Sequence, residues 1–472
     1  MSDISKLSAS ELLVAYANKS LSPVEVTKDV LARLERAEPA INAFTIVAAE
    51  EAMAQANASE KRWMTGELTG AADGVVTTIK SNIATKGWHM RRGSTTVGYE
   101  AMAYDAPIVS NLRRAGCIFV GQTTMPEFGW IGATHSKLTG ITKNPWNTRR
   151  TPGGSSGGAA AAAALNIGQF HIGSDGAGSI RIPCAFSGVF GIMPSIGRVP
   201  AYPASPFGVL ARLGPMTRSV NDGALMLKIM AGCDRRDIAN MPTPAPDYMG
   251  ELVKGLRGLR IGWSACLGFV ETLQPEVRKA CEDAVQRLTE FGAIVQDADP
   301  DFSHAAAYGP LRVLWDAGCA QVLKSVPPDK HKDIDAGFML CALAGQKLSA
   351  TDVLQALQER AALYETMRKY HERFDVLITP TMPTTAIEAG VEVPRDGSFG
   401  DQWFNWSPYT WPFNVTGQPA ASVPVSLASN GMPIGLQIVG PIHREDLVLR
   451  VAKGVEMLSG FSVLDEIRTG EA

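Results

Sequence analysis

The stretch Thr151–Pro183, TPGGSSGGAAAAAALNIGQFHIGSDGAGSIRIP, holds two glycine-framed serine turns joined by an alanine run. The turns are Gly153–Gly158 and Gly176–Ser179. Glycine at this density is costly in chain entropy, so it is usually placed where the backbone needs φ > 0 or approaches another group closely. The alanines, 159–164, form helix readily and suit a helix buried on all sides against a sheet. The stretch therefore predicts buried structure with turns that can expose backbone amides.

The polar residues of this stretch lie at the ends of its predicted elements. Ser155 and Ser156 stand at the amino end of the alanine helix, where unpaired amides and the helix dipole favour negative charge. The apolar run 170–172 indicates a short buried strand that ends at Ser174 and Asp175. Beyond it, successive backbone N–H groups in a tight loop would form an oxyanion hole. Its predicted members are Gly176, Ala177, Gly178 and Ser179.

Three functional hypotheses compete for these turns. A phosphate-binding loop would need Lys-Ser or Lys-Thr after the second glycine group, where Ala159 stands. A nucleophile elbow fits 153–157 as G-x-S-x-G, with Asp375 and His443 downstream in a permitted order. The third hypothesis uses Lys80, which closes a β-branched run that predicts a buried strand. Burial disfavours the ammonium form, so such a lysine could be neutral and act as a base.

With Lys80 included, the chain resembles the amidase signature family, whose members use a Lys, cis-Ser, Ser triad. GGSSGG at Gly153–Gly158 is followed by GSDGAGSIRIP at Gly173–Pro183, so that Ser155 and Ser179 lie 24 positions apart. In the family that spacing separates the bridging serine, found in a cis peptide, from the nucleophile. The resemblance implies that Lys80, Ser155 and Ser179 are catalytic. Ser81 stands where the family usually has Asp.

Further family-like segments extend the resemblance from about residue 23 to about residue 460, and they imply other site residues. Ser156, Asp175 and Arg181 would support the serine turns, and Gly129, Trp130 and Ile131 would border the substrate. Departures from the family pattern are Ile192-Met193 and Gly176-Ala177. The segments that carry the match are GQTTMPEFG at 121–129, NPW at 144–146, GVFGIMP at 188–194, GPMTR at 214–218, FNVTGQPAASVP at 413–424 and PIGLQIVG at 433–440.

The order of apolar patterns predicts an α/β fold with one large central mixed β-sheet flanked by helices. Capping boxes at Ser8 and Ser22 predict two amino-terminal helices, in a helical segment 1–60 that packs on the core. Residues 61–472 are predicted to form a single amidase-signature domain, with a helical decoration at about 300–373. The Pro-rich and charged stretch 233–255 is predicted to be a surface connection.

Composition narrows the functional classes. A net charge of −3 gives no bias toward binding nucleic acid. The sequence has no apolar run of 18 residues, so a membrane partner is not expected. Met1–Ser10 lacks the features of a signal peptide, so a cytoplasmic location is expected. The seven cysteines form no C-x-x-C pair and His371 does not fit H-E-x-x-H, so neither a metal nor another cofactor is expected. A homodimer is expected only from the commonness of two-fold dimers.

The resulting functional hypothesis is an amidase that hydrolyses small-molecule carboxamides through an acyl-enzyme. Aromatic residues crowd the segment 403–413, which leads into a motif that approaches the active site in this family. Aryl or apolar acyl amides, or related hydrazides, are therefore the expected substrates. Two alternatives remain. One is the glutaminase subunit of an amidotransferase working with partner subunits, a branch that often has Gln where Ile182 stands. The other is a catalytically inactive binding or scaffold protein.

Overall fold

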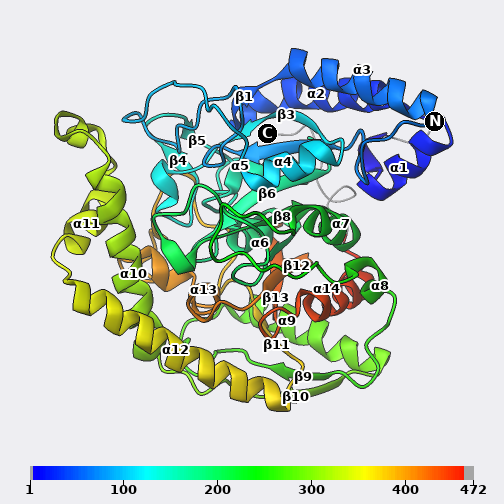
Figure 1. Ribbon diagram of the computed structural model, residues 1–472. Coiled ribbons are helices and arrows are strands. Elements are labelled where there is room, and N and C mark those ends of the chain that lie inside the picture. The colour runs from blue at the N-terminus through cyan, green and yellow to red at the C-terminus, as the bar shows by residue number, and fades with distance from the viewer. Residues whose placement is uncertain (1–3, 462–472) are drawn as a thin grey trace.

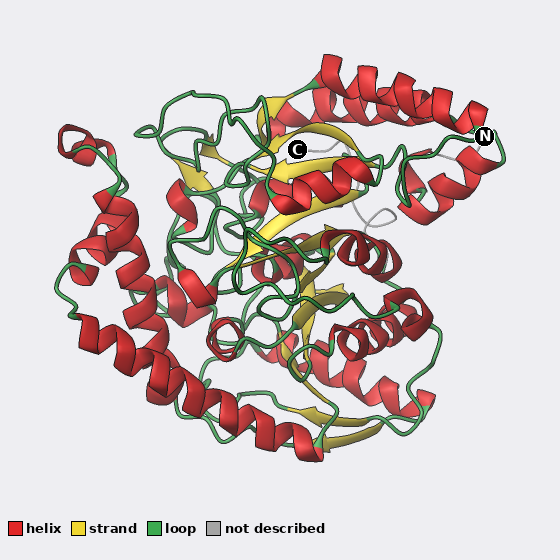
Figure 2. Cartoon of the chain, viewed as in Figure 1, coloured by secondary structure: helices red, strands yellow, loops and turns green. Residues whose placement is uncertain are grey.

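The computed structural model describes residues 4–461 as layers built on one twisted sheet (Figures 1 and 2). Within those residues the sheet has 11 strands, in the order β1-β3-β2-β6-β8-β7-β12-β13-β11-β9-β10. Parallel pairs occur on both flanks and antiparallel pairs join them, which confirms the predicted mixed sheet. In sheet order the strands are Phe44–Val47, Ile118–Thr123, Val76–Lys80, Phe170–Asp175, Arg212–Thr217, Phe190–Met193, Ala420–Leu427, Pro433–Val439, Val376–Pro380, Arg260–Trp263 and Ile294–Asp297.

The amino-terminal segment forms helices that pack at one end of the sheet (Figure 1). Both predicted capping boxes are present, at Ser8 with Glu11 and at Ser22 with Glu25. The apolar stripe of the second helix is buried against the core, as its spacing predicts. The helices are α1 (Ala9–Ala17), α2 (Pro23–Ile41) and α3 (Ala49–Thr65), which extends past the predicted limit at residue 60. Residues 1–3 and 462–472 of the two predicted segments lie outside the described residues.

The region 300–373 is helical, as predicted, but it is more than a decoration. It contains α10 (His304–Lys324), α11 (Ala336–Gly345) and α12 (Ala350–Arg373), which lie along the left and lower margin of Figure 1. Trp315 of α10 is buried and packs on the site described below. The stretch 233–255 lies mostly at the surface, as predicted, but it contains α8 (Tyr248–Leu252), whose Tyr248 is fully buried.

Two short helices begin at the serine turns. α5 (Gly157–Ala164) is buried throughout, and a Cβ at Gly158 would come within 2.6 Å of the Thr124 backbone. Only glycine permits this approach, so the alanine helix lies directly against the sheet. α6 (Arg181–Ser187) follows the second turn and contacts β12 and β13. The other helices are α4 (Pro107–Arg114), α7 (Val220–Met230), α9 (Pro275–Arg287), α13 (Trp411–Thr416) and α14 (Glu445–Ser459).

Strand order explains why distant residues meet. β2 and β6 are parallel neighbours, with Ile79 opposite Ile172, so their carboxyl ends lie at the same edge of the sheet. β2 ends at Lys80 and β6 ends at Asp175. Antiparallel β8 begins at Arg212, directly opposite Asp175. The edge where parallel strands end is the usual place for a ligand in an open α/β sheet, and the predicted site residues gather there.

Candidate active site

Lys80 is fully buried at the end of β2, surrounded by serine hydroxyls. Its Nζ lies 2.7 Å from Ser155 Oγ, 2.8 Å from Ser156 Oγ and 2.9 Å from Ser174 Oγ. Burial lowers the pKa of Lys80 well below its usual value, while the negative charge of Asp175 opposes part of that shift. The environment therefore favours the neutral amine, the form that can accept a proton.

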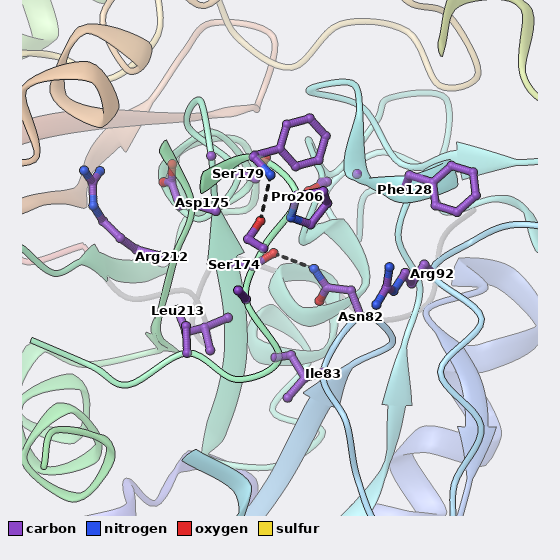
Figure 3. Close-up of a pocket in the computed structure, with 18 of the residues that line it drawn as sticks. Asn82, Ile83, Arg92, Phe128, Ser174, Asp175, Ser179, Pro206, Arg212 and Leu213 are labelled. Carbon is purple, nitrogen blue, oxygen red and sulfur yellow. Dashed lines mark hydrogen bonds between the residues drawn. The ribbon is translucent and has the colours of Figure 1, made fainter. Parts of the chain in front are cut away.

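The hydroxyl protons around Lys80 can be assigned from their partners. Ser156 Oγ donates to the Ser174 carbonyl at 3.2 Å, so its single proton is committed and it can only accept from Lys80. Ser174 Oγ accepts from Asn82 Nδ2 at 3.0 Å (Figure 3). Among residues 4–461, Ser155 Oγ has no partner other than Lys80. The Ser155 hydroxyl is therefore the one best placed to give its proton to the neutral amine.

Ser155 and Ser179 face the same cavity, and the peptide bond Gly154–Ser155 is cis, as the family resemblance implies. Within the described chain no hydrogen bond joins the two hydroxyls, although the Ser156 N–H donates to the Ser179 carbonyl at 3.2 Å. Catalytic hydrogen bonds are often long without substrate and shorten in the reacting complex. The first link of the predicted relay is thus present, and the second would have to close on binding.

The predicted oxyanion hole needs one correction. The Gly178 N–H donates to the Asp175 carboxylate at 2.7 Å, so this amide is already engaged. Gly178 has φ 126 and lies against Thr410. With this backbone conformation its N–H points to the Asp175 carboxylate. The N–H groups of Gly176, Ala177 and Ser179 have no acceptor within residues 4–461. They are the amides that remain for an oxyanion.

A buried ion pair fixes the second turn. Arg181 Nε donates to Asp175 Oδ2 at 3.0 Å, and both side chains are fully buried. Burial opposes ionisation of Asp175, but the Arg181 guanidinium holds its pKa at about 2. Arg181 also donates to the carbonyl of Thr410 and to Gln437 Oε1, at 2.7 and 2.8 Å. These contacts tie the turn to Thr410 and to β13.

Ser155 and Ser179 line a cavity of about 120 Å³. Figure 3 shows Ser179 among the residues around it. Its apolar wall includes Phe128, Phe207 and Trp315, with the Phe207 and Trp315 ring centroids 4.5 Å apart. A Cβ at Gly176 would lie 3.3 Å from the Trp315 ring, so this ring covers the oxyanion turn. The lining residues that the sequence analysis did not assign to the site include Asn82, Arg92, Ser174, Phe207, Arg212 and Trp315.

Of the three predicted substrate contacts, only Gly129 lines the cavity, and Trp130 and Ile131 do not. Phe128 and Gly129 both have left-handed backbones, with φ 53 and φ 75. This reversal directs Phe128 into the cavity and Trp130 away from it, onto Gly337 of α11. Ile131 is buried in the hydrophobic core. The prediction for Trp130 and Ile131 was wrong because it could not include this turn of the chain.

The position of segment 403–413 before an active-site motif suggested that its rings, except Phe413, form a pocket wall, and this prediction is wrong. Phe413 is buried in the core, as predicted. All six rings are buried and none lines the cavity. Trp403 and Phe404 contact Trp315, with centroids 5.7 and 5.6 Å away, so they support the wall from behind. The six residues are Trp403, Phe404, Trp406, Tyr409, Trp411 and Phe413.

The nucleophile-elbow hypothesis fails on geometry. Neither Asp375 nor His443 lines the cavity of Ser155. Asp375 pairs with Arg260 at 3.0 Å, and the backbone N–H of His443 donates to Ser195 Oγ.

Among the described residues, no three His, Cys, Asp or Glu side chains are grouped to hold a metal ion. In the same part of the chain, each helix is too short or too polar to cross a membrane.

A family model described as Amidase matches residues 25–449. The chain belongs to the amidase signature family. It is 33% identical to an acylamidase of Rhodococcus erythropolis, over 95% of each chain. It is 35% identical to a glutamyl-tRNA(Gln) amidotransferase subunit of Methylococcus capsulatus, over 94% of this chain and 95% of that one. The crystal structure of a bacterial aryl acylamidase of this family superposes with a TM-score of 0.91 at 30% identity, covering 99% of both chains.

Because it belongs to this family, the chain is classed as an amidase signature hydrolase and not as a binding or scaffold protein. Similarity alone does not separate the acylamidases from the amidotransferase subunits, since relatives of both kinds match at 33 to 35% identity. The choice between an acylamidase and an amidotransferase subunit therefore depends on the residues that line the cavity.

Proposed function

We propose that Ser179 is the nucleophile of an amidase in which Ser155 relays a proton to Lys80. The observation that carries the proposal is the 2.7 Å approach of the buried Lys80 amine to Ser155 Oγ, beside a cavity that Ser179 also lines. Neutral Lys80 takes the Ser155 proton, Ser155 takes the Ser179 proton, and Ser179 Oγ forms a bond to the substrate carbonyl carbon.

The remaining steps use the same groups in reverse. The N–H groups of Gly176, Ala177 and Ser179 would stabilise the oxyanion of the tetrahedral intermediate. Ser155 returns a proton to the amide nitrogen as the C–N bond breaks, which releases the amine and leaves Ser179 acylated. Water then attacks the ester carbonyl, so that the acid leaves and Ser179 regains its proton.

For the substrate, we propose aryl or apolar acyl amides. The cavity wall of Phe128, Phe207 and Trp315 supports this class, since burying a ring contributes about 1.5 to 3 kcal/mol. The relatives named acylamidase and aryl acylamidase support it as well. A glutaminase subunit is the competing function, and its relatives match equally well. The fully buried Ile182, where that branch often has Gln, favours the amidase.

A substrate panel tests this choice. We expect kcat/KM for an aryl amide to exceed that for acetamide, malonamate or glutamine by at least about tenfold, because of the apolar wall. Phe207→Ala should reduce the preference for aryl over acetyl groups by about threefold or more, since this ring lines the cavity. Phe291→Ala, at an exposed ring outside the cavity, is the matched control. Glutamine as the best substrate would instead support the amidotransferase function.

A further inference from the structure

Arg92 is a cationic side chain of the cavity whose guanidinium has no partner among the described residues. It lines the active-site cavity and also a second cavity beside it, and Phe128 lines both. Its backbone is held in place, because its N–H donates to the Ser81 carbonyl and its carbonyl accepts from the Phe128 N–H at 2.7 Å. Within residues 4–461, the guanidinium makes no hydrogen bond, no ion pair and no contact over an aromatic ring. A partly buried arginine normally satisfies several of its five donors.

The other charged groups of the cavity already have partners, although Arg212 Nε has none among residues 4–461. Figure 3 shows Asp175 and Arg212 on one side and Arg92 on the other, beside Phe128. Asp175 is neutralised by Arg181. Arg212 is buried and donates to the carbonyls of Val209, Phe413 and Asn414. No acidic group of the cavity is therefore left for Arg92.

The acidic residue of the second cavity is not paired with Arg92 either. Glu100 lines it together with Arg92, yet no N···O distance between the two is within 4.0 Å in the described chain. The active-site cavity thus has one compensated ion pair, Asp175 with Arg181, at its edge. Two further guanidinium groups line it, those of Arg92 and Arg212. Burial also lowers the pKa of Arg92 from its ordinary value, as expected for a desolvated cation without a carboxylate beside it.

A planar guanidinium with free donors is suited to a carboxylate, which it can bind through two parallel hydrogen bonds. We propose that Arg92 binds a carboxylate on the substrate, so that the preferred amides carry an acid group away from the scissile bond in addition to their aryl or apolar part. This inference rests on the proposed amidase function and narrows its substrate class.

Matched amide pairs test the inference. In one series the acid group is on the amine side, as an apolar acyl amide of 4-aminobenzoate against the same amide of 4-methylaniline. In the other it is on the acyl side, as an ω-carboxyacyl 4-nitroanilide against the ω-methyl analogue of equal length. We expect kcat/KM for the acid to exceed that for its neutral partner by at least about tenfold in one series, through the charge-assisted contact.

Substitution of Arg92 assigns the preference. Arg92→Gln should remove it by lowering kcat/KM for the acid only, and Arg92→Lys should retain part of it. Arg149→Gln removes an equal charge from an exposed position outside the cavity and should change neither substrate. Equal rates within both pairs, or an unchanged preference in Arg92→Gln, would overturn the inference. Equal losses on acid and neutral amides in Arg92→Gln would also overturn it, since they would show a structural role.

Hydrolysis of the neutral amides keeps this test separate from the proposed function. If the neutral amides are cleaved through Ser179 but no acid preference is found, the amidase stands and the carboxylate site fails. If neither member of any pair is cleaved, the proposed function itself fails.

Discussion

The turn Ser174–Arg181 and the wall around Arg92 line the same cavity, but they differ in how their polar groups are paired. In the turn, Asp175 and Arg181 hold each other. Asp175 also accepts from two amides of the turn, and Arg181 also donates to groups outside the turn. At the wall, the Arg92 guanidinium has no partner among the described residues, and the neighbouring side chains are mainly apolar. Pairing offsets part of the cost of burying a charged group, whereas an unpaired group bears that cost in full until a ligand supplies a partner.

The difference suggests that the paired turn serves the chemical steps and that the wall around Arg92 serves substrate recognition. The chemical steps are the same for every amide, so the groups that perform them benefit from a fixed arrangement. Recognition depends on the substrate, and the groups at the wall are available for it. Substitutions in the paired region should therefore reduce activity toward all amides, while substitutions at the wall should change the ranking of amides.

Lys80→Met should have the largest effect. It removes the proposed base and should lower kcat/KM by about 10² to 10⁴ for every amide, while the uncharged side chain remains compatible with burial. Steady-state rates and thermal unfolding measure the two effects. Ser81→Ala is the matched control, because the buried Ser81 hydroxyl has no hydrogen-bond partner among residues 4–461, Lys80 included. Near wild-type turnover in Lys80→Met would make Lys80 structural.

The pH dependence of kcat/KM follows from the same group. Burial lowers the pKa of Lys80, and only the neutral amine accepts a proton, so activity should rise tenfold per pH unit below that pKa and then level off. The plateau should be reached well below pH 10.5, the ordinary lysine value. A stopped assay over pH 5 to 10 would show it, and a rate still rising near pH 10 would contradict a neutral Lys80.

Asp175→Asn should destabilise the paired region and slow all amides alike. Removing one partner of a buried pair leaves Arg181 uncompensated, which costs about 3 to 5 kcal/mol of unfolding free energy. The pKa of Asp175 is depressed to about 2, so its contribution is present above its ordinary pKa of 3.8 and is lost as the pH falls toward 2. Urea unfolding at pH 7 and pH 3 checks this, with the exposed Asp396→Asn as control. A stability gap that widens in acid would oppose it.

Of the four predicted effects, that of Asn82→Ala should be the smallest. Asn82 Nδ2 donates to Ser174 Oγ, which in turn contacts Lys80, so its loss should lower kcat by about threefold to tenfold through one hydrogen bond. A positioning role predicts that KM for a neutral amide stays unchanged. The matched control is Asn57→Ala, at an exposed position of α3. A rise in KM without a change in kcat would place Asn82 in binding instead.

The strand pattern was enough to predict the sheet, and the family resemblance named two of the three serines around Lys80, Ser155 and Ser156, but not Ser174. Local patterns carry that information: a β-branched run ends in Lys80, and two glycine-framed turns place Ser155 and Ser179 24 positions apart. The wall could not be predicted in the same way. It combines Arg92, Phe207 and Trp315 from separate segments, and Phe128 faces the cavity only because its own φ is 53. Such reversals depend on tertiary contacts that periodicity does not encode.

The central claim is that Ser179 carries the acyl group, and labelling with a fluorophosphonate tests it most directly. Ser179 and Ser155 both line the cavity, so peptide mass spectrometry can assign the modified serine. The account predicts one label per chain on the Ser179 peptide, none in Ser179→Ala, and slowed labelling of Ser179 in Lys80→Met. A label on Ser155 with Ser179 unmodified, or amide hydrolysis that persists in Ser179→Ala, would contradict it.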